Sequence, residues 1–174
     1  MAVSTTVFDK FFNKDDRDLL IKQVVACAWP ISPEDPESLY HWSMSLYVNP
    51  EKGVTLDILP AGVDGRTGVL VISSKLEGMP THDLNRTVTL NIGKDNTTVQ
   101  DIIQAILDNK RDRYRYDDTG SGCRFWVGTV IEDLEREGRL SGNSLERFLM
   151  FVSELYEAEG ENRVPMPPRT GVFY

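Results

Sequence analysis

Residues 39–48 read LYHWSMSLYV, and apolar and polar side chains alternate along this segment. The apolar members of the alternation fall on one face: Tyr40, Trp42, Met44, Leu46 and Val48. Successive side chains of a β-strand point to opposite faces, so a period of two suits a half-buried strand and does not suit a helix. The segment therefore predicts a strand with His41 on its polar face.

Further strands are predicted on both sides of this one. Residues 49–53 (NPEKG) form a predicted turn, and residues 54–59, 68–73 and 86–92 have the composition of strands joined by short links. Residues 19–29 (LLIKQVVACAW) are almost continuously apolar, which favours a buried strand in their second part, with a short helix as the alternative. Together these segments predict an antiparallel meander.

Three helices are predicted after the strands. Thr97 or Thr98 opens the first, with Gln100 or Asp101 as its capping-box partner. The second runs over residues 123–137 and ends at Gly138, and Asn143 with Glu146 indicates a capping box for the third. The predicted inward face of the third helix is Leu145, Phe148, Leu149, Val152 and Tyr156. Strands followed by helices, without a repeated βαβ unit, predict an α+β fold in which the meander packs against three helices.

The domain organisation is predicted to be simple. Residues 1–18 are polar and form an expected N-terminal arm, and residues 19–174 form an expected single domain. Residues 164–174 are rich in proline but end in Val172, Phe173 and Tyr174. We expect these three side chains to pack back on the domain.

The net charge of −8 argues against a nucleic-acid partner, because such a surface repels phosphates. The basic segment 110–115 is interrupted by Asp112 and favours a solvated helix end over an anion site. The sequence shows neither the apolar core of a signal peptide nor a membrane span, so we expect a cytoplasmic protein. Cys27 and Cys123 are then expected to be free thiols. The sequence does not predict an oligomeric state.

Several motifs with strong mechanisms are absent from the sequence: the Walker loop, the Gly-x-Gly-x-x-Gly fingerprint, zinc-spaced Cys/His pairs and the Gly-x-Ser-x-Gly elbow. We therefore expect no cofactor and no metal. The informative segment is GSGCRFW at residues 120–126, which places Cys123 in the first turn of a predicted helix, directly after glycines. A helix N-terminus and Arg124 both favour a thiolate, and backbone N–H groups around Gly122 can hold an oxyanion.

A nucleophilic cysteine needs a base. His41 is the better candidate of the two histidines, because a strand holds an imidazole more rigidly than the predicted loop that carries His82. Asp57, on the same predicted hairpin, is placed to orient the imidazole. Trp42 and Trp126 are expected to form walls of a substrate pocket, and Gly122 and Arg124 are expected to contact the substrate as well.

The same residues also allow interpretations without catalysis. Cysteine beside Phe125 and Trp126 is often a small core residue, and this interpretation is favoured for Cys123 and strongly favoured for Cys27. His41 can be an ordinary strand histidine beside Trp42, and Asp57 can bond to a turn or to Arg66.

The blocks LYHWSMSLYV, VTLDILP, GVLVISSK, SGCRFWVGTVIEDLEREG and RTGVFY resemble a family of small uncharacterised fungal proteins over most of residues 24–174. More loosely, the order of a His-Trp strand and a Gly-Cys helix start resembles circularly permuted papain-like thiol enzymes of the lecithin:retinol acyltransferase-like and cell-wall peptidase-like kinds. That resemblance implies that His41 is the base and Cys123 the nucleophile. The Asn-Cys-Glu-His-Phe block of the acyltransferases is missing.

Three functions follow as expectations. The first is a thiol hydrolase or an acyl or amide transferase that uses Cys123, His41 and Asp57 on a small metabolite or peptide, in a fungal secondary-metabolite pathway if the first resemblance holds. The second is a non-covalent cyclase or isomerase that uses His41 and Asp57 in acid–base chemistry. The third is a non-catalytic binding or interaction module.

Overall fold

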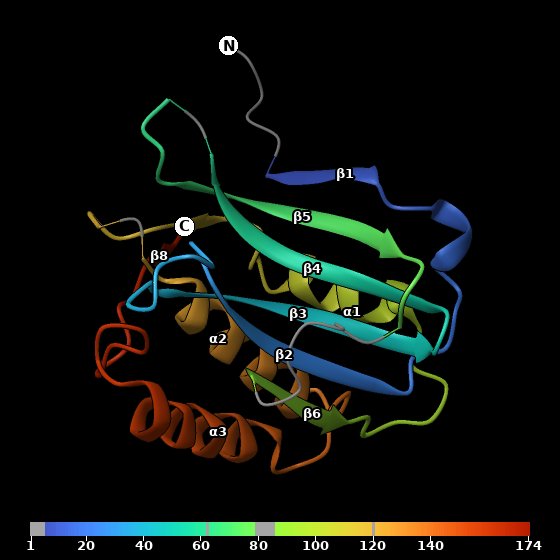
Figure 1. Ribbon diagram of the computed structural model, residues 1–174. Helices are drawn as coiled ribbons and strands as arrows, with labels where there is room; N and C mark the ends of the chain where they lie inside the picture. The colour runs from blue at the N-terminus through green and yellow to red at the C-terminus, as the bar shows by residue number, and fades with distance from the viewer. Residues whose placement is uncertain (1–5, 62, 79–85, 120) are drawn as a thin grey trace.

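The computed structural model describes residues 6–61, 63–78, 86–119 and 121–174, which form a curled sheet with three helices (Figure 1). The strands are β1 (Val7–Phe11), β2 (Gln23–Pro30), β3 (Tyr40–Asn49), β4 (Lys52–Ala61), β5 (Thr67–Lys75), β6 (Thr87–Asn91), β7 (Tyr114–Arg115) and β8 (Val172–Phe173). The helices are α1 (Val99–Asp108), α2 (Cys123–Arg136) and α3 (Ser144–Glu159), and a short 3₁₀ turn, η1, covers Lys14–Asp16. The predicted α+β class is confirmed.

The strand order is β6-β2-β3-β4-β5-β7-β8, with β1 beside β5. Strands β2 to β5 form the predicted meander, but the predicted place of β6 is wrong, because β6 pairs with β2 and not with β5. Residues Val24 to Ala28 of β2 are buried on both faces of the sheet. A strand buried this deeply needs hydrogen-bond partners on both edges, and β6 supplies the second edge.

The hairpin of β3 and β4 opens at one end. The pairing of β3 with β4 extends from Asn49 and Lys52 near the turn to Met44 and Leu56. Beyond this point, residues 40–43 of β3 and residues 57–61 of β4, all of which the structure describes, do not pair with each other. Figure 1 shows β4 curving away from β3 toward the end where α2 begins. The first residues of β3 and the last residues of β4 thus face a gap in the sheet, and their side chains can approach one another across it.

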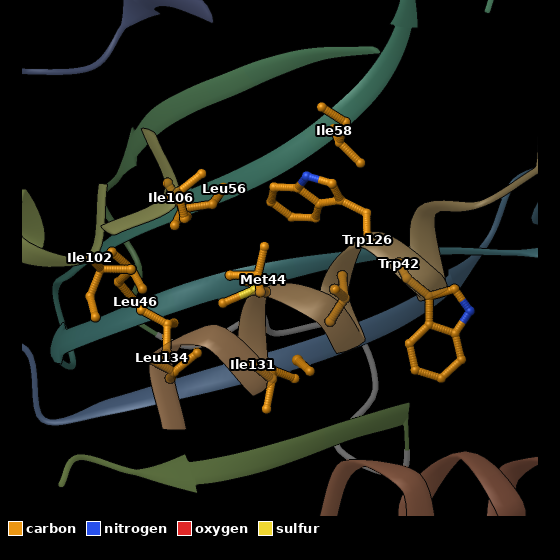
Figure 2. Close-up of a cluster of buried hydrophobic side chains, with 14 of the residues drawn as sticks. Trp42, Met44, Leu46, Leu56, Ile58, Ile102, Ile106, Trp126, Ile131 and Leu134 are labelled. Atoms are coloured by element: carbon orange, nitrogen blue, oxygen red, sulfur yellow. The ribbon is translucent and has the colours of Figure 1, made fainter. Parts of the chain in front are cut away.

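The main core lies between α2 and the paired parts of β3 and β4. Met44 of β3 lies near Ile131 of α2 in Figure 2, and both are fully buried, as is the Trp126 indole. The Trp42 ring points toward α3 instead, where it lies 5.7 Å from the ring of Phe148. The strand residues alternate with a period of two and those of α2 recur every three or four positions, so each element presents a continuous apolar face. This core fixes the position of α2, and with it the position of Cys123.

The helix starts differ from one another. Thr98 and Asp101 form the predicted capping box of α1. The predicted capping box of α3 is wrong: the Asn143 side chain caps nothing, and the N–H of Leu145 instead donates to Oε2 of Glu135 on α2 at 2.8 Å.

The inward face of α3 also differs from the prediction in one position. Leu149 was expected inside but is 53% exposed, whereas Leu155 is buried. The face that packs is set by where α2 and β6 contact the helix, and it passes through Phe148, Val152 and Leu155 at spacings of four and three.

Both terminal segments contact the sheet. Residues 7–11 of the predicted arm form β1, which runs parallel to β5. Asp16 of the same segment is 1% exposed and pairs with Lys52 Nζ and Ser74 Oγ, both at 2.7 Å. At the other end of the chain, β8 pairs with β7, and the Phe173 ring lies 4.9 Å from that of Tyr114. Val172 and Tyr174, which were expected to pack, are 65% and 59% exposed.

Candidate active site

The gap between β3 and β4 holds a cavity of about 380 Å³. Its described lining combines aromatic and aliphatic side chains with a few polar ones, and it comprises Trp29, Ile31, Leu39, Tyr40, His41, Trp42, Asp57, Leu59, Pro60, Tyr116, Ser121, Gly122, Cys123, Arg124, Pro165 and Arg169. The volume and the mixture of apolar walls with a few polar groups are those of a small-molecule site. The three residues predicted to be catalytic, Cys123, His41 and Asp57, all lie on this cavity.

His41 and Asp57 face each other across the gap. Asp57 Oδ1 lies 2.7 Å from His41 Nε2, and the two side chains are 14% and 15% exposed. The Trp29 ring lies 5.6 Å from the imidazole and covers part of it. A hydrogen bond this short and this shielded holds the imidazole in one orientation and leaves Nδ1 for a second partner.

The surroundings of His41 favour its protonated form. Burial lowers the pKa of His41, but the hydrogen bond to Asp57 and the negative charge of that carboxylate, together with the nearby Cys123 sulfur, raise it to about 10. At neutral pH the ring is therefore an imidazolium, and it lines the same cavity as Cys123.

Cys123 is the first residue of α2 and is half-buried, so its sulfur is within reach of a ligand in the cavity. The N–H groups of Cys123, Arg124 and Phe125 have no hydrogen-bond partner within the described ranges, as is usual for a first helical turn without a side-chain cap. Cys27 differs in every respect: it is 2% exposed in β2, and burial raises the pKa of its thiol to about 12.

The approach to Cys123 requires glycine at position 122. Gly122 has φ +141°, and a Cβ there would lie 2.3 Å from Oη of Tyr114. That same hydroxyl donates to the carbonyl of Gly122 at 2.8 Å and accepts from the N–H of Gly171 at 2.9 Å. A buried tyrosine therefore joins the start of α2 to the C-terminal segment.

The loop before α2 is braced as well. Oδ1 of Asp117 accepts hydrogen bonds from the N–H groups of Thr119 and Ser121, both at 2.9 Å. The loop that delivers Cys123 to the cavity is thereby held by its own side chains.

Arg124 follows the cysteine and is 8% exposed. Its Nη2 donates to the carbonyl of Pro165, and its guanidinium lies 6.0 Å from the centre of the Trp42 ring. Its Nη1 is buried without a hydrogen-bond partner in the described structure. Burial lowers the pKa of Arg124, and the negative charge of a Cys123 thiolate raises it.

The remaining predicted site residues have mixed outcomes. Trp42 and Gly122 line the cavity, but Trp126 does not and is not a wall of the site. Its indole is fully buried in the core and donates to the carbonyl of Arg111 at 2.7 Å. A helical stripe and a pocket wall look alike in a sequence, which is why Trp126 was misplaced. His82 lies outside the described residues.

Other lining residues were not predicted at all. Tyr116 is buried, donates to the carbonyl of Ile58 and has a pKa raised by burial. Pro165 and Arg169 come from the C-terminal segment. No local pattern marks these residues, because they reach the cavity through contacts between segments far apart in the chain, such as the pairing of β7 with β8 and the hydrogen bond from Arg124 to the carbonyl of Pro165.

Two arginines of the basic segment 110–115 are paired with carboxylates. Arg111 binds the carboxylate of Asp133 through Nε and Nη2 at 2.5 and 3.2 Å, and Arg115 pairs with Asp64 at 3.2 Å. The described residues contain no group of three or more His, Cys, Asp or Glu side chains placed to hold a metal ion. In the same part of the chain, no helix has the length and apolar composition needed to cross a membrane.

Comparison with known proteins gives one match. Residues 23–174 match a family model described as "Domain of unknown function (DUF7770)". No curated protein and no solved structure matches the chain.

Proposed function

The chain belongs to the DUF7770 family, whose description assigns no activity, and from the geometry of its cavity we propose that it is a thiol hydrolase or acyl transferase acting on a small molecule. One observation carries the proposal: Cys123, at the start of α2, and the part-buried His41–Asp57 pair line the same cavity. A nucleophile, a base and a group that orients the base are the three parts that covalent catalysis requires.

The first half of the reaction forms an acyl-enzyme. The Cys123 thiolate attacks the carbonyl carbon of the substrate, and the π electrons of the carbonyl move to its oxygen. The unpartnered N–H groups of the first turn of α2 are suited to stabilise this oxyanion. When the tetrahedral intermediate collapses, the bond to the leaving group breaks, and the His41 imidazolium gives its proton to that group.

The second half of the reaction regenerates the thiolate. The imidazole, now neutral, takes a proton from water or from an acceptor alcohol or amine as that molecule attacks the thioester. The bond to sulfur breaks, and the products are the carboxylic acid or the transferred acyl group and the Cys123 thiolate. Asp57 keeps the imidazole in one orientation throughout both halves.

A second candidate function needs only His41 and its partner Asp57. A protonated imidazole in an apolar cavity can act as a general acid for a non-covalent cyclase or isomerase, with Asp57 as its partner. In that case Cys123 would only be part of the cavity wall.

A reactive thiol is best preserved in a reducing compartment, so the thiol mechanism is consistent with a cytoplasmic protein.

The test uses 4-nitrophenyl acetate, an activated ester that needs no specific recognition. We expect a burst of 4-nitrophenol and an acetyl group on the Cys123 peptide, identified by mass spectrometry. Cys123→Ala should remove both, His41→Gln should slow the burst by about 10²–10⁴-fold, and Cys27→Ala should change nothing. Nitrophenol release retained within about tenfold in Cys123→Ser would exclude covalent catalysis, because the loss of a nucleophile has far larger effects.

A further inference from the structure

The charged groups of the cavity lining carry more positive than negative charge. The described lining includes the guanidinium groups of Arg124 and Arg169 and the His41 imidazolium, against the carboxylate of Asp57 and, in the mechanism proposed above, the thiolate of Cys123. Asp57 is already bound to His41. The chain as a whole has a net charge of −8, so this local excess runs against the charge of the molecule.

Arg124 is the centre of this excess. It is more than nine-tenths buried, it forms no ion pair with any carboxylate in the described residues, and its Nη1 lacks a hydrogen-bond partner there. Its one protein hydrogen bond, to the carbonyl of Pro165, engages the other terminal nitrogen. Removing a guanidinium from water without a counter-ion is unfavourable, and buried polar atoms without partners are rare in folded proteins.

An anion in the cavity would supply the missing partner. Arg169 also lines the cavity but is exposed, so it can attract an anion from solvent without being its final partner. Much of the remaining lining is apolar, including Trp29, Leu39, Trp42 and Leu59. A guanidinium is a favourable partner for a carboxylate, because a hydrogen bond between two charged groups is stronger than one between neutral groups.

We propose that the substrate of the thiol reaction is a carboxylate with an apolar body, and that the Arg124 guanidinium supplies the positive charge for its carboxylate group while the apolar walls hold the body. This inference rests on the function proposed above and assigns the substrate class of the same site. It also gives Arg124 a role besides stabilising the Cys123 thiolate.

The test compares two alkylating agents that differ mainly in charge, iodoacetate and iodoacetamide. Their rates of reaction with Cys123 are measured by peptide mapping. The rate with iodoacetate is divided by the rate with iodoacetamide, and this ratio is then divided by the same ratio for N-acetylcysteine. In the wild-type protein we expect this normalised ratio to be about 10 or more at low salt. It should fall as salt is added, because salt screens the attraction between the negative reagent and the positive cleft.

Arg124→Gln should bring the normalised ratio close to 1. Because both reagents report on the same thiol, any effect of the substitution on thiol reactivity cancels in the ratio. Arg17→Gln removes the same charge from an exposed position outside the cavity lining and should leave the ratio high. If Arg124→Gln does not fold, the wild-type ratio and its salt dependence still show whether the cavity prefers a carboxylate reagent over a neutral one.

The outcomes separate the two proposals. A wild-type ratio near 1, with Cys123 labelled rapidly by both reagents, would overturn the carboxylate inference and leave the thiol mechanism standing. A high ratio that persists in Arg124→Gln would overturn the role of Arg124. If neither reagent labels Cys123 in the native protein, the thiol mechanism fails, and the inference fails with it.

Discussion

At the residue scale, the site depends on a buried imidazole that sits between two acceptors. Burial alone would make His41 a weaker base, but the carboxylate of Asp57 and the sulfur of Cys123 outweigh it and raise the pKa to about 10. The hydrogen bond to Asp57 thus both orients the ring and keeps a proton on it. A protonated ring is ready to serve a thiolate as a counter-ion and a leaving group as an acid.

We therefore predict that His41 titrates near pH 10 and not near 6.5. The measurement is a ¹³C or ¹⁵N NMR titration of labelled histidine in a His82→Gln background, which leaves one ring. Asp57→Asn should move the midpoint down toward 6.5, because it removes a hydrogen bond and a negative charge. A wild-type midpoint near 6.5 would contradict the arrangement described here.

The sign of the pKa shift also predicts how stability depends on pH. The folded pKa lies above the unfolded one, so the contribution of His41 is complete below about pH 6.5 and disappears as the pH rises through about 10. Wild type should therefore be more stable than Asp57→Asn below about pH 6.5, and this difference in unfolding free energy should decrease as the pH rises to about 10. Urea denaturation of both proteins at several pH values measures the difference.

At the element scale, the three helix starts use different partners. The cap of α1 comes from its own sequence, through Thr98 and Asp101. The first turn of α3 takes its acceptor from α2, through Glu135. The first turn of α2 has no side-chain cap among the described residues, and the N–H groups of Cys123, Arg124 and Phe125 have no hydrogen-bond partner there.

This difference predicts unequal effects of three substitutions on the free energy of unfolding. Thr98→Ala should destabilise the protein by about 1 kcal/mol, the typical loss for a helix cap. Glu135→Ala should have a comparable effect, because it removes the acceptor of the Leu145 N–H, whereas Asn143→Ala should lie within about 0.5 kcal/mol of wild type. Urea denaturation decides, and a loss for Asn143→Ala as large as that for Thr98→Ala would contradict the assignment.

At the scale of the whole molecule, the C-terminal segment completes the site. Pro165 and Arg169 line the cavity, Gly171 bonds to Tyr114, and β8 extends the sheet beside β7. Phe173 is the anchor of this segment: its ring contacts those of Tyr114 and Phe125, and the Arg111 guanidinium lies 4.6 Å from its centre. Residues far apart in the sequence thus close one wall together.

Phe173→Ala is therefore predicted to lower the melting temperature by about 2–8 °C, which corresponds to about 1–2 kcal/mol for a half-buried aromatic side chain. Tyr174→Ala is the matched control, because that side chain is 59% exposed and should contribute little. Thermal unfolding followed by circular dichroism measures both. An unchanged melting temperature in Phe173→Ala would mean that the segment is not anchored through this ring.

The sequence by itself determined the local elements and the residue types of the site. The alternation in residues 39–48, the helical stripes and the capping box of α1 are short-range patterns, and short-range geometry is sufficient to produce them. The same kind of reasoning placed Cys123 at a helix start and His41 and Asp57 on one hairpin.

Only the tertiary structure decided how these pieces meet. The pairing of β6 with β2, the opening of the β3–β4 hairpin, the burial of Trp126 and the isolation of Arg124 all depend on contacts between segments far apart in the chain. A periodic pattern shows which face of an element is buried, but it does not show what that face packs against. For this reason the cavity and its charged lining could be described only from the tertiary structure.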